Sequence, residues 1–203
     1  MNFPIISSLI LLPTIGALFL FFTKSSKENN ITFKYVALFT SLVNFFLSIY
    51  LWILFDQSTS EFQFIEDRTW IKGLMNYKVG IDGISILFVI LTTCITPLCI
   101  ISVNNSIKNR LREFLIAVLI MESFMIGVFC SLDLVVFYLF FEAGLIPMFL
   151  IIGIWGGARR VYSAFKFFLF TLLGSVLMLV AIISIYWLSG TTDFVQLYEL
   201  GID

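Results

Sequence analysis

A single carboxylate, Glu142, interrupts an apolar stretch that carries no other charge between Asp133 and Arg159. At about 1.5 Å of rise per helical residue, Glu142 lies roughly 13 Å from Asp133, close to halfway through a hydrocarbon core of about 30 Å. A carboxylate at that depth costs about 2.5–3.5 kcal/mol on the most lenient scale, so it normally faces a partner or water. Glu142 is therefore predicted to be a proton site, which we favour over a structural hydrogen-bonding role.

The residues that follow Glu142 suggest a local irregularity in its helix. Pro147 cannot donate a hydrogen bond to the carbonyl of Ala143, and its ring crowds that carbonyl, so a bend or loosening is expected there. Ala143 and Gly144 are small, which allows a neighbouring helix to approach the carboxylate closely.

A second intramembrane carboxylate, Glu122, is related to Glu142 by the turn between their helices. Glu122 precedes Leu132 by ten residues and Glu142 follows it by ten. An antiparallel helix pair would place both groups at similar depth, but spacing does not determine whether they face each other. If they do, they would titrate as a coupled unit. A relay role for Glu122 and a neutral, hydrogen-bonded role both remain open.

Three further charged residues have simpler interpretations. Lys166 is the one base within a predicted span, about one turn from its basic end, and snorkelling to the interface is favoured over a secondary relay role. Asp82 and Asp133 stand at predicted helix starts, where a carboxylate caps free N–H groups and complements the helix dipole.

The composition excludes several kinds of site. The chain has no His, so it offers no His-ligated haem and no Ser-His or Cys-His nucleophile. Cys94, Cys99 and Cys130 lie in apolar runs without metal-ligand spacing, and we interpret them as small hydrophobic residues. A net charge of −1 without a basic stripe argues against a nucleic-acid partner.

Six apolar spans account for most of the chain. With 60% apolar residues, 12% charged residues and a mean hydropathy of +1.05, the composition is typical of a polytopic membrane protein. We predict an all-α bundle forming a single membrane domain (1–203), with spans at about 3–22, 35–55, 82–103, 114–130, 133–153 and 163–187. The polar segment 56–80 predicts a short strand pair or an interfacial piece. The N-terminus lacks a basic region, so no removable signal peptide is expected.

The basic residues support this number of spans. The turns after the first, third and fifth spans collect nine of the twelve bases, and three bases mixed with acids remain for the other side. This asymmetry is the one expected from the positive-inside rule, and it places both termini on the less basic side.

Four sequence blocks together resemble one family. They are Val79-Gly-Ile-Asp-Gly-Ile-Ser, the stretch from Phe137 to Met148 around Glu142, Ile154-Trp-Gly-Gly, and the stretch from Phe165 to Ser175. In this order and spacing they resemble NADH dehydrogenase (ubiquinone) subunit 4, the antiporter-like subunit called chain M in bacterial complex I. The similarity covers most of the chain from about residue 79 onward, and plant and protist versions resemble it closely.

The resemblance implies a proton-translocating subunit of respiratory complex I, an NADH:ubiquinone reductase, in the mitochondrial inner membrane or, alternatively, a bacterial plasma membrane. Glu142 would be the family's helix-five glutamate, which pairs with a lysine on helix seven, and Glu122 matches a position where many members carry Glu. No cofactor is implied on this chain, because FMN, iron–sulfur clusters and ubiquinone belong to other subunits.

The chain departs from the family in length, with six spans where the family has about fourteen. We therefore expect membrane lipids, other membrane-arm subunits and a second chain or fragment carrying the helix-seven lysine as partners. The alternatives are a subunit of a related cation/proton antiporter or membrane-bound hydrogenase, and a non-catalytic membrane scaffold.

Overall fold

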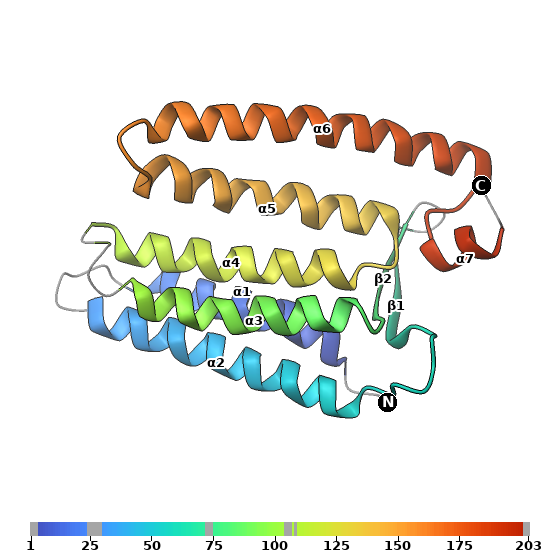
Figure 1. Ribbon diagram of the computed structural model, residues 1–203, viewed down its shortest axis with the longest axis horizontal. Helices are drawn as coiled ribbons and strands as arrows, with labels where there is room; N and C mark the ends of the chain where they lie inside the picture. Colours follow the sequence, from blue (N-terminus) through green and yellow to red (C-terminus); the bar gives the residue numbers. More distant parts are fainter. Residues whose placement is uncertain (1–3, 24–29, 72–74, 104–106, 108, 201–203) are drawn as a thin grey trace.

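The computed structural model describes residues 4–23, 30–71, 75–103, 107 and 109–200. Six long helices lie side by side along the longest axis of the molecule, and a two-stranded hairpin and one short helix lie at one end (Figure 1). The long helices are α1 (Ile5–Phe22), α2 (Asn30–Leu54), α3 (Ser85–Ser102), α4 (Leu111–Cys130), α5 (Leu134–Trp155) and α6 (Arg160–Ser189). The short helix is α7 (Phe194–Glu199). The prediction of an all-α bundle with six spans is confirmed.

All six long helices are long and apolar enough to cross a membrane. Their bounds differ from the predicted ones mostly at the polar ends, where backbone hydrogen bonding continues past the apolar residues: α2 begins at Asn30 and α6 at Arg160. Helix α5 continues through Pro147 without interruption. The irregularity expected after Glu142 therefore does not divide the helix.

Helix α4 forms the centre of the bundle. It packs against α1, α2, α3 and α5, and half of its most apolar stretch is buried. Two clusters of buried apolar side chains surround it, one centred on Leu9, Ile86 and Ile126 and the other on Leu20, Leu115 and Leu119. Helix α6 lies at the edge, and α5 is its main neighbour (Figure 1).

The polar segment after α2 forms an antiparallel hairpin of β1 (Gln63–Ile71) and β2 (Met75–Ile81), which confirms the predicted strand pair. The carboxylate of Glu66 on β1 accepts hydrogen bonds from the backbone of Ile6 at 2.9 Å and Ser7 at 3.3 Å. The first N–H groups of a helix have no partner within it, so Glu66 caps α1 from a distant strand.

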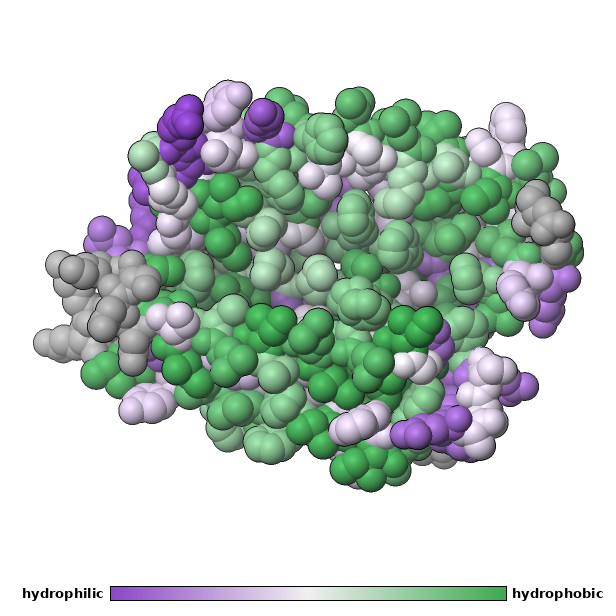
Figure 2. Space-filling view, viewed as in Figure 1, coloured by the Kyte–Doolittle hydropathy of each residue, from purple (hydrophilic) through white to green (hydrophobic). Residues whose placement is uncertain are grey.

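The surface divides into an apolar belt and polar ends. In Figure 2, hydrophobic residues cover most of the middle of the visible face, and hydrophilic ones gather toward the ends. The N-terminal ends of α4 and α6, next to which Arg110, Arg159 and Arg160 stand in the sequence, lie at the end opposite the hairpin (Figure 1). This arrangement agrees with the charge asymmetry noted in the sequence.

Candidate functional site

Glu122 is buried at the centre of the bundle, where it is hydrogen-bonded to α2. Its side chain is 1% exposed, and Asn44 is fully buried. The Nδ2 atom of Asn44 donates to Oε1 of Glu122 at 2.8 Å. The other carboxylate oxygen of Glu122, Oε2, and the amide oxygen of Asn44, Oδ1, are buried without a hydrogen-bond partner in the described part of the chain.

Asn44 belongs to a buried polar stripe on α2. Ser41, Asn44 and Ser48 recur at intervals of three and four residues, which places them on one face of the helix. Ser48 shares a 2.7 Å hydrogen bond with Thr93 of α3, and both hydroxyls also reach backbone carbonyls of their own helices. These hydroxyl groups are therefore satisfied, whereas the Asn44–Glu122 pair is not.

Ser123, which follows Glu122 on α4, is hydrogen-bonded to α1. The hydroxyl of Ser123 lies 2.7 Å from that of Thr14 and also donates to the carbonyl of Ile10 on α1. Because Ser123 is tied to α1 and Glu122 to α2, the rotation of α4 about its axis is constrained from two sides.

Contacts between α4 and α5 show how the two carboxylates are oriented. A Cβ atom added at Gly127 would lie 2.6 Å from the ring of Phe140, and one added at Gly144 would lie 3.8 Å from Cβ of Phe124. With 3.6 residues per turn, Phe124 and Gly127 lie nearly opposite Glu122 on α4, and Phe140 and Gly144 lie nearly opposite Glu142 on α5. The two carboxylates thus sit within about one turn of each other in depth but do not face each other.

Glu142 lies on the side of α5 that faces α6. It shares this side with Phe149, which packs against Phe165 and Phe168 of α6. Its Oε2 atom is buried and accepts no hydrogen bond from the part of the chain that the structure describes. Because α5 and α6 are antiparallel, the contacts of Phe149 with Phe165 and Phe168 imply that Glu142 lies at about the same depth as Ser175. Ser175 is buried, and its hydroxyl donates to the carbonyl of Leu172.

Lys166 is separate from both carboxylates. It is exposed on the first turns of α6, and no ion pair to it occurs among the described residues. Nine residues separate it from Ser175, or about 13 Å along the helix. The structure therefore does not bring Lys166 next to Glu142.

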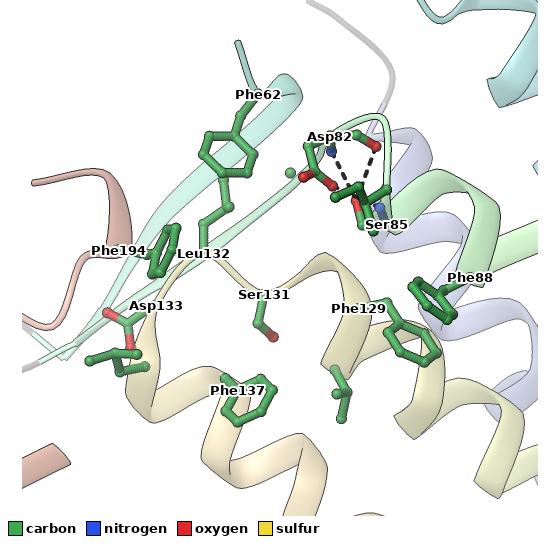
Figure 3. A pocket seen from close by; sticks show the side chains of 14 residues that line it. Phe62, Asp82, Ser85, Phe88, Phe129, Ser131, Leu132, Asp133, Phe137 and Phe194 are labelled. Atoms are coloured by element: carbon green, nitrogen blue, oxygen red, sulfur yellow. Dashed lines mark hydrogen bonds between the residues drawn. The ribbon is translucent and has the colours of Figure 1, made fainter. Parts of the chain in front are cut away.

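A pocket of about 520 Å³ lies at the hairpin end, where β2, α3, α5 and α7 converge (Figure 3). Five of the fourteen residues that line it are phenylalanines, among them Phe88 and Phe129, whose rings stack with centroids 5.1 Å apart. Asp82 exchanges hydrogen bonds with Ser85, as Figure 3 shows, and Asp133 accepts from the first turn of α5. Asp133 thus caps α5, as predicted. Asp82 lies three residues before the first residue of α3, Ser85, and accepts a hydrogen bond from its backbone N–H.

A larger cavity, of about 760 Å³, runs along α1, α4 and α5. It reaches from Ser7 and Tyr77 near the hairpin to Ser123 and Ala143, the residues next to the two carboxylates in sequence. A space of this size can hold water molecules, provided that polar partners are present. The hydroxyls of Ser7, Thr14, Tyr77 and Ser123 are already hydrogen-bonded within the chain, and most of the remaining lining is apolar.

Asn44 was not identified from the sequence as a site residue. A lone amide in an apolar run carries no motif, and its partner depends on how the helices are rotated. The signal that could have found it is the helical spacing of Ser41, Asn44 and Ser48, since three polar residues on one face of a span indicate a buried neighbour.

The chain is similar to several known proteins. The family described as NADH:quinone oxidoreductase/Mrp antiporter, TM, matches residues 131–202. "NADH-quinone oxidoreductase subunit M" of Rhodobacter capsulatus is 60% identical over 164 residues, covering 81% of this chain and 32% of the relative. "NADH-ubiquinone oxidoreductase chain 4" of Marchantia polymorpha is 48% identical over 93% of this chain and 38% of the relative. The chain thus spans about a third of the length of these relatives.

Two solved structures share the fold. Respiratory complex I from Thermus thermophilus contains a chain with a TM-score of 0.79 and 28% identity, matched over 95% of this chain and 38% of that one. The archaeal membrane-bound sulfane sulfur reductase contains one with a TM-score of 0.82 over 98% of this chain and 40% of that one. At 17% identity the second match shows the fold alone.

Proposed function

Because the chain is homologous to the subunit M and chain 4 proteins of NADH:quinone and NADH-ubiquinone oxidoreductases, we propose that it is part of a proton-translocating subunit in the membrane arm of respiratory complex I. In this proposal Glu142 exchanges protons during turnover, and Glu122 holds a second proton deeper in the bundle. The complex as a whole couples NADH oxidation by ubiquinone to proton movement. This chain carries no redox step.

The observation that carries the proposal is the buried, unpartnered oxygen of Glu142 in the α5–α6 interface. A carboxylate within a membrane is retained against a considerable cost, so it has a partner or a function. An oxygen without a fixed hydrogen bond can accept a proton, or the hydrogen bond of a water or an ammonium group, without first breaking another contact.

A second polypeptide would complete the site. Only 11% of the most apolar stretch of α6 and 17% of that of α5 is buried, so both helices have large faces available to further helices or lipid. A lysine from a neighbouring helix would keep Glu142 ionised when it is close and allow protonation when it moves away. Other membrane-arm subunits and lipids would cover the remaining surface.

The redox cofactors would lie elsewhere. FMN, iron–sulfur clusters and ubiquinone would be held by other subunits of the complex, and we propose no cofactor for this chain. Relatives from a liverwort and a fungus, at 48% and 47% identity, support a mitochondrial inner membrane. Bacterial relatives at 45–60% support a plasma membrane as the alternative. Fractionation of cells against markers of both membranes distinguishes the two.

The test is Glu142→Gln in the assembled complex, with NADH oxidation and proton translocation measured in the same vesicles. Loss of a group that transfers protons lowers a rate by about 10²–10⁴-fold, so transport through this subunit should cease and the protons moved per NADH should fall. Glu113→Gln, on an exposed carboxylate of α4, is the matched control. Unchanged pumping in a fully assembled Glu142→Gln complex would indicate a scaffold instead.

A subunit of a cation/proton antiporter or membrane-bound hydrogenase is the second candidate. The description of the matched family includes the Mrp antiporters, and the fold is also present in the sulfane sulfur reductase. Purification through a tag on this chain separates the candidates, because only complex I would bring NADH-oxidising flavin and iron–sulfur proteins with it.

A further inference from the structure

The pair formed by Asn44 and Glu122 holds two of the four buried, unpartnered polar side-chain atoms in the described part of the chain. The other two are Oε2 of Glu142, on α5, and Nε of Arg112, in the first turn of α4. Within the pair, one hydrogen bond is made, from Nδ2 of Asn44 to Oε1 of Glu122, and both remaining atoms are acceptor oxygens. Two acceptors can be satisfied only if a hydrogen is supplied between them.

We infer that Glu122 carries a proton on Oε2 and donates it to Oδ1 of Asn44, so that the carboxylic acid and the amide form a ring of two hydrogen bonds. One added proton would then satisfy both oxygens at once. Asn44 is thus a positioning residue that selects the protonated form of Glu122. The pairing of Asn44 with a protonated Glu122 does not depend on the proposed function. A role of Glu122 as a proton store on a transport path does depend on it.

The charges around the pair favour a neutral acid. Helices α1 and α3 contain no charged residue, and the one charge on α2, Lys34, is ten residues from Asn44, or about 15 Å. On α4 the other charges, Arg112 and Glu113, lie in the first turn. On α5, Glu142 faces α6. A buried carboxylate without a nearby cation is costly to ionise, and in practice such a group takes up a proton instead.

The surrounding hydroxyl groups do not supply the missing donor. Ser41 and Ser48 donate to carbonyls of α2, and Thr93 reaches carbonyls of α3. Ser123 donates to the carbonyl of Ile10. The rival source is a water molecule that donates both of its hydrogens, one to each oxygen, beside an ionised Glu122.

Infrared difference spectra of the assembled complex, wild type minus Glu122→Gln, distinguish these two states. A protonated Glu122 contributes a carboxylic acid C=O band at neutral pH that the variant loses. Asn44→Leu should move this band to higher frequency, because the carbonyl then loses its hydrogen bond from Nδ2. Glu113→Gln, the control, should leave the band unchanged. Carboxylate bands in place of the acid band would overturn the inference in favour of the water.

The use of two variants, Glu122→Gln and Asn44→Leu, keeps the test decisive even if one of them prevents assembly of the complex. If Glu122→Gln does not assemble, Asn44→Leu addresses the same band with all carboxyl groups present, and an unshifted acid spectrum would overturn the pairing. The spectra also separate this inference from the proposed function. An acid band together with normal pumping in Glu142→Gln would refute the function and leave the pairing intact. Loss of pumping in Glu142→Gln without an acid band would support the proposed function and refute the pairing.

Discussion

The ammonium group of Lys78 on β2 lies 2.5 Å from Oδ2 of Asp193, the residue that caps α7. Both side chains are largely buried, at 13% and 12% exposure. Next to this pair, Asp133 caps α5 and accepts a hydrogen bond from Thr192. The hairpin, the start of α5 and the segment after α6 are thereby joined at one end of the bundle.

Removal of either partner of the Lys78–Asp193 pair should destabilise the hairpin end. Breaking a buried pair leaves one charge uncompensated, at a cost of about 3–5 kcal/mol. Lys78→Met and Asp193→Asn should each lower the free energy of unfolding, and the double variant should lose less than the sum of the two. Denaturant titration of the purified protein in detergent measures this coupling. Strictly additive losses would mean that the pair contributes no interaction of its own.

Glu66 should contribute to stability through α1, although it lies on β1. Glu66→Ala removes the carboxylate that accepts from Ile6 and Ser7, and loss of a helix cap typically costs about 0.5–2 kcal/mol. Asp67→Ala, on the exposed neighbouring residue of the same strand, serves as the control. Amide hydrogen exchange should increase in the first turn of α1 in the Glu66 variant alone. Equal protection in both variants would contradict this assignment.

Gly127 permits the close packing of α4 on α5. An added Cβ would lie 2.6 Å from the Phe140 ring, so Gly127→Ala should force the helices apart and cost about 1–3 kcal/mol as an overpacked contact. Gly174→Ala is the matched control, because nothing lies within 4 Å of a Cβ added there. The two variants can be compared by thermal unfolding in detergent. A Gly127 variant as stable as the control would disprove the claim that α4 and α5 need a glycine at this contact.

Lys166 should be dispensable for proton transfer through Glu142. It is exposed and lies about 13 Å along α6 from the level of that carboxylate. Lys166→Met should therefore retain the pumping that Glu142→Gln loses. A loss of pumping of similar size in both variants, with assembly intact, would restore a relay role for this lysine.

Tyr77 should make the hairpin sensitive to alkali. Burial raises the pKa of its phenol above the ordinary value of 10.0, against a smaller opposing effect of its hydrogen bond with Ser7. Above pH 10 the phenol keeps its proton in the folded protein but loses it in the unfolded chain, which favours unfolding. The contribution of Tyr77 to the free energy of unfolding is therefore complete below about pH 10 and is lost as the pH rises further. Tyr77→Phe should reduce the loss of stability above pH 10, as followed by circular dichroism.

The long elements and their caps could be predicted from the sequence because their signals are local. Apolar runs of sufficient length define the six spans, and Asp82 and Asp133 stand where helices begin. The partners of Glu66, Glu122 and Lys78 could not be predicted, because each lies on an element distant in sequence. Their identity depends on helix rotation and on how the hairpin docks, and neither leaves a pattern in a single sequence. The same reason explains why the depth of Glu142 was predictable and its direction toward α6 was not.

The peripheral position of α6 has a consequence for biosynthesis. Helices α1 to α4, together with Val79 and Ile81 of β2, supply nearly all buried members of both apolar clusters, and α5 and then α6 pack on one side. A nascent chain can thus assemble its interior while the last two spans are still emerging from the ribosome, since membrane segments enter the bilayer in chain order. Of the two carboxylates within the spans, Glu142 would be inserted after Glu122, when the interior formed by α1 to α4 is already in place. A helix from another polypeptide could therefore still pack beside Glu142.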